Sequence, residues 1–121
     1  MNMGYYSQVG LCVKQKDFEE LKERFGTEYG YMLEKNFCDI ITIEDSDYGN
    51  IIVCNWDSIK WYPYSFKEIV MVEDFLSELE ERDEEFSFVR IGEEYGDIEI
   101  RDNYINGCCD RLHLYQGFEI Y

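Results

Sequence analysis

Residues 65–91, SFKEIVMVEDFLSELEERDEEFSFVRI, contain the clearest structural pattern in the chain. Apolar residues recur there at the spacing of a single helix face, which consists of Ile69, Val72, Phe75, Leu76 and Leu79. The capping-box pattern of Ser65 and Glu68 predicts where this helix begins. Residues 86–91 predict a strand directly after it. We expect the helix to pack on a sheet through its apolar face, with Phe75 in the core.

The first part of the chain predicts a strand followed by a second helix. Residues 5–13 alternate with a period of two, which is typical of a strand with one well-buried face. Asp17 and Glu20 form another capping box, and Gly26 supplies a left-handed stop. The apolar face between them consists of Phe18, Leu21 and Phe25. Residues 27–36 are irregular, with tyrosines that can add one further helical turn.

The remaining segments predict four more strands. Residues 37–44 and 51–56 form an antiparallel hairpin around turn formers, and the second of these strands can extend to residue 61. Residues 97–101 predict a fifth strand, and residues 112–121 can pair as a sixth. The order is therefore β-α-β-β-α-β with one or two strands added at the C-terminal end.

This order predicts an α+β fold in a single domain that covers residues 1–121. Two strand–helix–strand halves favour an antiparallel sheet of about five or six strands with both helices on one face. We therefore expect a ferredoxin-like core. A chain of 121 residues is too short for two independent cores.

The composition is strongly acidic, which limits the classes of partner. The chain has 27 Asp and Glu against 11 Lys and Arg, for a formal net charge of −16. Nucleic acids and anionic membranes repel such a surface, whereas a basic patch on another protein attracts it. No apolar run is long enough to span a bilayer and no secretory signal is visible, so we expect a cytoplasmic protein.

The five cysteines and the lone histidine predict no cofactor, metal site or catalytic centre. Cys12, Cys38 and Cys54 lie in strand-like apolar runs, where a reduced thiol behaves as a small hydrophobe. Cys108 and Cys109 with His113 form the one hint of a metal site, but they lack a second paired motif. No nucleophile–base pair and no phosphate-binding loop can be assembled, so we expect a protein that is not an enzyme.

Several segments resemble a group of small uncharacterised proteins of tailed phages and prophages. The start Gly4-Tyr5-Tyr6-Ser7-Gln8-Val9 is similar to their Gly-Tyr-x-Ser-x-Val opening. Residues 56–62, 72–76, 88–93 and 97–99 are similar as well, so the likeness covers most of residues 4–100. The resemblance implies a phage or mobile-element origin and transfers no activity. Small acidic phage proteins often inhibit bacterial defence, as anti-CRISPR proteins do, and the expectation here is by analogy.

Two acidic segments are candidate contact surfaces for a partner. The denser one consists of Glu78, Glu80, Glu81, Asp83, Glu84 and Glu85. Spaced carboxylates of this kind can mimic a nucleic-acid backbone, or they can simply solvate a helix end. Glu93 and Glu94 form the second segment, in a glycine-bounded loop that Asp97, Glu99 and Asp102 follow closely. Oxygen ligands there, as in residues 45–50, can also bind a hard cation, but turn chemistry explains both loops better.

An aromatic segment is the third candidate surface. It consists of Trp56, Trp61, Tyr62, Tyr64 and Phe66. Trp56 and Phe66 are assigned to the core. Trp61, Tyr62 and Tyr64 cannot all face inward, so this loop is predicted to contact a partner.

Together these features favour an acidic inhibitor or adaptor that binds a basic surface of a host protein, such as the nucleic-acid groove of a defence complex. The alternative is a module that binds or sequesters a small molecule such as a nucleotide signal. That alternative needs a phosphate cradle, and the bases loosely available for one are Lys14, Lys16, Lys60, Arg90, Arg101 and Arg111. A metal-dependent enzyme is a third class, without a motif to support it.

Overall fold

The computed structural model describes residues 4–45, 47, 49–104, 109, 112–115 and 117–120, and of 113–115 and 117–120 only the backbone. The first half of the chain forms β1 (Ser7–Lys14), α1 (Gln15–Phe25), a short 3-10 helix η1 (Gly30–Leu33), β2 (Asp39–Asp45) and β3 (Gly49–Ile59). The second half forms α2 (Lys67–Glu81), β4 (Phe86–Gly92), β5 (Ile98–Asn103), β6 (Leu112–Tyr115) and β7 (Gly117–Ile120).

The main sheet has five strands in the order β2-β3-β1-β4-β5, and every neighbouring pair is antiparallel. The predicted α+β class and antiparallel sheet are therefore confirmed. The sheet differs from the four-stranded ferredoxin-like arrangement, because β5 extends it beyond β4. The predicted sixth strand is wrong as well: β6 and β7 pair with each other in a separate two-stranded sheet.

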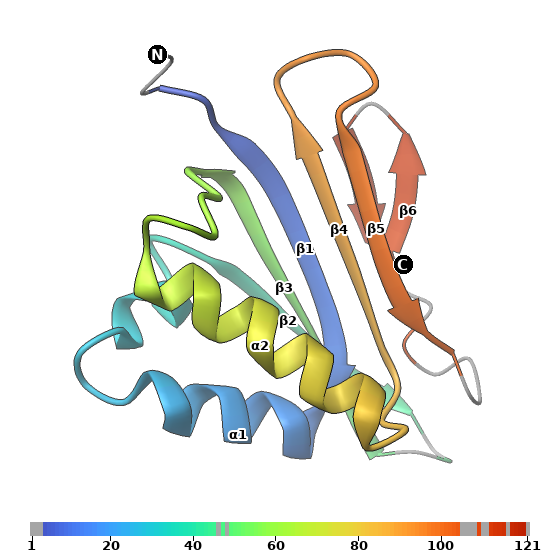
Figure 1. Cartoon of the computed structure of the whole chain (residues 1–121). Coiled ribbons are helices and arrows are strands. Elements are labelled where there is room, and N and C mark those ends of the chain that lie inside the picture. Colours follow the sequence, from blue (N-terminus) through green and yellow to red (C-terminus); the bar gives the residue numbers. More distant parts are fainter. Residues whose placement is uncertain are drawn as a thin grey trace.

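Both helices cover the same face of the sheet, where the main core lies (Figure 1). The buried residues of α2 are the five that the apolar spacing predicted, and Phe75 is fully buried. A smaller core on the other face includes Cys12, Val53 and Val89. The central strand β1 is therefore buried on both faces, because each face contacts a core. Its sequence predicted only one buried face.

The helices begin differently from the prediction. Strand β1 runs directly into α1, so Lys14 occupies the cap position and Asp17 lies inside the first turn. Phe66 occupies the cap position of α2, and neither helix has a side-chain cap. Both predicted capping boxes are wrong. Gly26 does end α1, with φ +58° and its N–H donating to the Lys22 carbonyl at 3.2 Å.

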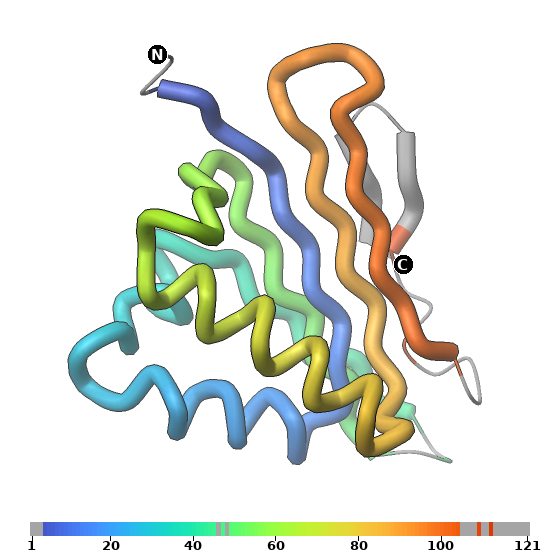
Figure 2. The backbone as a smooth tube through the Cα atoms, in the orientation of Figure 1, coloured from blue at the N-terminus to red at the C-terminus, as the bar shows by residue number. Residues whose placement is uncertain are grey.

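The two helices lie side by side and run in opposite directions (Figure 2). The end of α1 therefore lies near the start of α2, and the start of α1 lies near the end of α2. The segment that enters β1 and the segment that leaves β3 meet at the first of these two ends. The end of α2 and the start of α2 carry the two surfaces described next.

Candidate functional site

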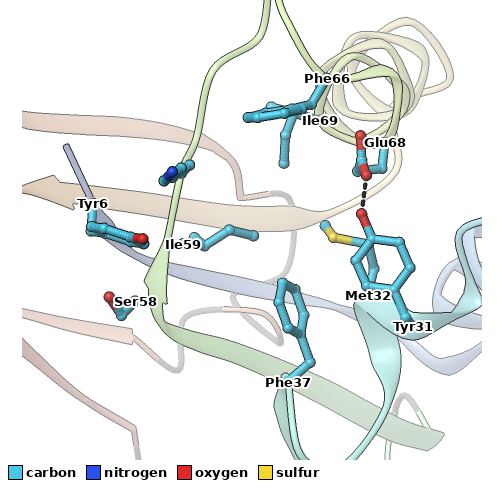
Figure 3. A pocket seen from close by; sticks show the side chains of 10 residues that line it. Tyr6, Tyr31, Met32, Phe37, Ser58, Ile59, Phe66, Glu68 and Ile69 are labelled. Carbon is cyan, nitrogen blue, oxygen red and sulfur yellow. Dashed lines mark hydrogen bonds between the residues drawn. The ribbon is translucent and has the colours of Figure 1, made fainter. Parts of the chain in front are cut away.

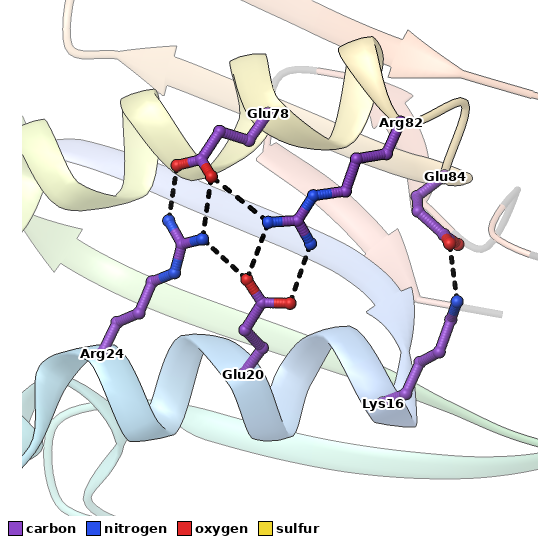
Figure 4. Close-up of polar contacts among 6 residues, drawn as sticks. All are labelled: Lys16, Glu20, Arg24, Glu78, Arg82 and Glu84. Carbon is purple, nitrogen blue, oxygen red and sulfur yellow. Dashed lines mark hydrogen bonds and ion pairs between the residues drawn. The ribbon is translucent and has the colours of Figure 1, made fainter.

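The acidic residues at the end of α2 form an ion-pair network with α1 (Figure 4). Arg24 Nη1 donates to Glu78 Oε2 at 2.6 Å, and Arg24 Nη2 donates to Glu20 Oε2 at 2.7 Å. Arg82 Nη1 donates to Glu20 Oε1 at 2.8 Å and so joins the two helices a second time. The hydrogen bonds from Arg24 lower the pKa of Glu78 to about 2. These four side chains hold α1 against α2.

Other members of the predicted acidic surface also have partners inside the molecule. Lys16 Nζ donates to Glu84 Oε1 at 2.6 Å, and Arg101 Nη2 lies 3.3 Å from Glu80 Oε1. Glu85 is fully buried, and its Oε1 accepts the Cys109 N–H at 3.4 Å. The prediction that Glu85 contacts a partner is therefore wrong, because a buried carboxylate is closed to one.

Two members of the predicted acidic surface remain free for contacts. Within the described residues, Glu81 and Asp83 are exposed and form no ion pair. They lie at the end of α2 and in the turn after it. The structure therefore uses most of this acidic segment to connect elements, and it leaves a small part of the charge at the surface.

The predicted acidic loop between β4 and β5 is tied to the start of the chain. Glu93 Oε1 accepts the Tyr6 N–H at 3.1 Å, and the Glu94 N–H donates to the Tyr5 hydroxyl at 3.1 Å. Both glutamate side chains are exposed. That Glu93 and Glu94 contact a partner stays a prediction, and the structure adds that Glu93 helps to position Tyr6.

A polar cluster beneath this loop contains Asp97, one of the acids that the sequence offered as oxygen ligands for a cation. Arg90 Nη2 donates to Asp97 Oδ1 at 2.8 Å, and the Tyr5 hydroxyl donates to Asp97 Oδ2 at 2.5 Å. The Arg90 guanidinium, followed by the Tyr5 hydroxyl, lowers the pKa of Asp97 to about 2. A Cβ on Gly92 would collide with the Asp97 carboxylate and the Tyr5 hydroxyl. This cluster fixes the segment that enters β1.

A hollow with aromatic walls lies at the start of α2 (Figure 3). Its volume is about 290 Å³, and the buried side chains of Met32, Ile59 and Ile69 contribute to its lining. Four half-exposed rings surround it, each 38–40% exposed: Tyr6, Tyr31, Phe37 and Phe66. We call this hollow, with its four rings, the aromatic groove.

Each ring of the aromatic groove comes from a different segment. Tyr6 precedes β1, Tyr31 lies in η1, Phe37 precedes β2 and Phe66 precedes α2. The tight 3-10 turn of η1 buries Met32 and leaves the neighbouring Tyr31 ring exposed. The rings of Tyr31 and Phe37 meet edge to face, with centroids 5.4 Å apart. Because the segments are held separately by the sheet and the helices, the rings surround an open space.

Two charged residues line the aromatic groove. Lys60 Nζ lies 5.5 Å from the centroid of the Tyr6 ring, over its face. The Tyr31 hydroxyl donates to the Glu68 carboxylate (Figure 3). Burial and this hydrogen bond raise the pKa of Tyr31 to about 12. The groove therefore combines aromatic faces with one cation and one hydrogen-bonded anion.

The structure places the residues of the predicted aromatic surface partly in the core and partly at the surface. Trp61 is only 6% exposed, packs between Trp56 and Phe88, and donates from Nε1 to Glu73 Oε1 at 2.9 Å. The prediction that Trp61 contacts a partner is wrong, because its polar atom is satisfied inside the core. The prediction of a core position for Phe66 is also wrong, since that ring lies in the aromatic groove.

The two remaining tyrosines of the predicted aromatic surface lie toward the solvent. Tyr62 is half-buried and stacks on Phe66, with ring centroids 5.7 Å apart. Tyr64 is 99% exposed. Sequence reasoning did not identify Tyr6, Tyr31 and Phe37 as site residues. The available signal was the group of aromatic residues within and beside the irregular segment 27–36.

The cysteines lie as the sequence predicted where the structure describes them. Cys12, Cys38 and Cys54 are buried free thiols, and a hydrogen bond with Cys38 together with burial raises the pKa of Cys54. Cys108 and the side chain of His113 lie outside the described residues. Among the residues that are described, no three His, Cys, Asp or Glu side chains are grouped to hold a metal ion.

Comparisons with protein-family models, curated proteins and solved structures gave no match. In the part of the chain that the structure describes, no helix is long and apolar enough to cross a membrane. The aromatic groove, with four half-exposed rings around a hollow of about 290 Å³, is the candidate site considered below.

Proposed function

We propose that the protein is a non-catalytic inhibitor or adaptor that binds a basic segment of a partner protein, with an Arg or Lys side chain of that partner inserted into the aromatic groove. The observation that carries the proposal is the groove itself: four half-exposed rings and the Glu68 carboxylate around a hollow of about 290 Å³. The net charge of −16 attracts a partner of this kind.

The chemistry of the groove suits a cationic side chain. The faces of aromatic rings attract ammonium and guanidinium groups, and the attraction strengthens when water is excluded. Lys60 already shows this interaction within the molecule, since its Nζ lies over the Tyr6 ring. A partner cation can take a comparable place against Phe37 or Phe66, and Glu68 adds a nearby negative charge.

The ion-pair network supports the proposal by keeping the groove walls in place. Arg24, Glu78, Glu20 and Arg82 join α1 to α2, and the elements that follow α1 and precede α2 carry Tyr31 and Phe66. A groove that is formed before binding loses less conformational entropy when a partner arrives. Aromatic side chains in such a setting contribute strongly to protein–protein contacts.

The acidic surface has a second role in this proposal. Exposed acids such as Glu81 and Asp83 accelerate the approach of a basic partner without making every final contact. A basic nucleic-acid-binding surface of a host defence complex is a partner of this chemistry, in line with the resemblance to phage proteins. The inhibitor would then occupy that surface in place of nucleic acid.

The alternative of a small-molecule module has one observation in its favour. The Lys60 ammonium lines a hollow whose size is near the lower limit of small-molecule sites, which is about 300 Å³. The other bases that a phosphate cradle would need are mostly occupied, because Lys16, Arg90 and Arg101 form ion pairs. The geometry therefore favours a protein partner.

Nuclear magnetic resonance titration of the ¹⁵N-labelled protein tests the proposal. The probe is the peptide acetyl-Gly-Arg-Gly-Arg-Gly-amide, and its matched control has citrulline in place of arginine, which is nearly isosteric but neutral. We expect the arginine peptide to shift the amides of Tyr6, Tyr31, Phe37 and Phe66, and the citrulline peptide to shift them much less. Equal shifts with both peptides, or shifts centred on Glu81 and Asp83, would contradict the proposal. Shifts of the groove amides with adenosine diphosphate alone would support the alternative.

A further inference from the structure

The strand β2 forms one edge of the main sheet. It pairs with β3 on one side, and among the described residues no strand pairs with its other side. Its side chains are largely exposed, with Ile40 at 37% and Ile41 at 42%. An edge of this kind presents unpaired backbone N–H and C=O groups to any extended chain that approaches it.

β2 lacks several features that commonly protect an edge strand, and its charged side chains are all acids near its two ends. Its sequence, DIITIED, contains no Lys and no Pro, and its register with β3 is continuous from Asp39 to Asp45. By contrast, the pairing of β3 with β1 shifts at an irregularity near Ser7. A regular seven-residue edge with β-branched residues at its centre is well suited to accept another strand.

The acids at the two ends of β2 decide which strand can be added. In an antiparallel pair of two copies centred on Thr42, Asp39 of each copy would lie opposite Asp45 of the other, and like charges opposite each other are unfavourable. The net charge of −16 on each copy adds to this repulsion. A strand with an apolar centre and basic ends would instead place opposite charges beside the same acids, which is favourable.

We infer that β2 binds an extended basic segment of the partner as an additional antiparallel strand of the sheet. The inference rests on the proposed function, because the occupant belongs to the same class of partner. Phe37 of the aromatic groove lies two residues before the start of β2, so one partner segment can pair with the edge and reach the groove. Backbone pairing would supply affinity, and the terminal acids would select basic sequences.

Hydrogen–deuterium exchange with a designed strand tests this inference. The probe is the amidated peptide acetyl-Lys-Lys-Val-Thr-Val-Val-Lys, whose lysines fall opposite Asp45, Glu44 and Asp39 when its threonine faces Thr42. The control replaces the three lysines by glutamate. We expect the basic peptide to slow amide exchange in residues 39–45 at low salt, and the acidic peptide to leave it unchanged. Slowed exchange elsewhere, with none in β2, would overturn the inference.

Charge reversal separates pairing at the edge from general attraction. The double variant Asp39→Lys/Glu44→Lys is expected to weaken the basic peptide about ten-fold and to bind the acidic peptide better. Glu19→Lys/Glu23→Lys makes the same charge change on the exposed side of α1 and should have little effect. An equal loss in both variants would show that net charge alone attracts the peptide, and the inference would fail.

Two further results distinguish this inference from the proposed function. If the basic strand fails to protect β2 while the arginine peptide still binds the aromatic groove, the edge inference fails and the proposed function stands. If the unmodified protein alone forms dimers in sedimentation, and amide exchange in residues 39–45 slows as its concentration rises, the occupant of the edge is a second copy and the inference is wrong.

Discussion

The two ends of α2 differ in which side chains they gather and in how far those side chains are satisfied within the molecule. At the end of α2, arginines and glutamates of both helices form ion pairs with one another. At the other end, four rings stay half-exposed around a hollow. The difference teaches that dense charge in a sequence does not mark a contact surface when a second element supplies counter-charges. Aromatic side chains that the fold leaves uncovered are the better marker.

The largest expected effect comes from the shared core beneath both ends. Phe75 is fully buried, and the Arg24 guanidinium lies 5.0 Å from its ring centroid. Phe75→Ala should lower the free energy of unfolding by about 3–5 kcal/mol, because it leaves a cavity and removes a contact of the network. Urea unfolding measures this. Val70→Ala, on the 37% exposed side of α2, is the control and should cost far less.

A buried carboxyl near the charged end gives the next effect. Asp17 is 3% exposed, and among the described residues its Oδ2 has no hydrogen-bond partner. Burial and then the Glu84 charge raise the pKa of Asp17 to about 6, while Lys16 and Lys14 lower it and Glu20 raises it. The folded state therefore binds a proton more readily than the unfolded state.

The sign of the pH dependence follows from this raised pKa. The contribution of Asp17 to stability should improve as the pH falls from 7 through 6 toward 4. Asp17→Asn should raise the free energy of unfolding at pH 7 by about 1–2 kcal/mol and remove this improvement. Melting temperatures of both proteins between pH 4 and 7 check it. A loss of stability in Asp17→Asn at pH 7 would contradict this, because it would show that favourable interactions of the Asp17 charge outweigh the cost of its burial.

The ion-pair network gives a smaller effect with the opposite pH dependence. The pKa of Glu78 is lowered to about 2, so its contribution to stability is present above its ordinary pKa of 4.5 and is lost as the pH falls toward 2. Arg24→Gln should lower stability at pH 7 by about 1 kcal/mol, since the pairs are partly exposed. It should also flatten the acid side of the stability profile. An unchanged profile would mean that Arg24 does not hold Glu78.

Added salt gives the smallest effect. It compares the attraction within the ion-pair network with the repulsion among the net negative charges. Screening weakens the attraction within the network, but it also weakens the repulsion among 16 net negative charges. We expect the repulsion to dominate, so the melting temperature should rise modestly from low to moderate salt. A falling melting temperature would show that the network controls the balance.

The sequence predicted best where one local pattern decides the structure. The apolar spacing of α2 identified its buried face, and the β-branched runs identified the strands. The capping box of Asp17 failed because β1 enters α1 without a loop, which moves Asp17 into the helix, and that of Ser65 failed because α2 is capped one residue later, at Phe66. Periodicity within one segment contains no information about a connection of this kind.

The candidate site was harder to predict because it depends on contacts between distant segments. The sequence predicted that Glu78 contacts a partner. In the fold its carboxylate instead accepts from Arg24, which lies 54 residues away in the sequence. The sequence placed Phe66 in the core and Trp61 at the surface, and the structure has the reverse. The Trp61 ring is buried because its indole N–H donates to Glu73, whereas Phe66 lies just before α2 at the rim of the core. The four rings of the groove come from four segments, so no local motif joins them.

One paired measurement tests most directly whether the partner binds the aromatic end or the charged end. Isothermal titration calorimetry with the arginine peptide compares Phe37→Ser/Phe66→Ser with Glu81→Gln/Asp83→Asn, after melting curves have shown that both variants fold. We predict that the aromatic variant weakens binding about ten-fold or more, and that the acidic variant weakens it less than about three-fold. The opposite order would contradict the account, because it would return the contact surface to the acidic end of α2.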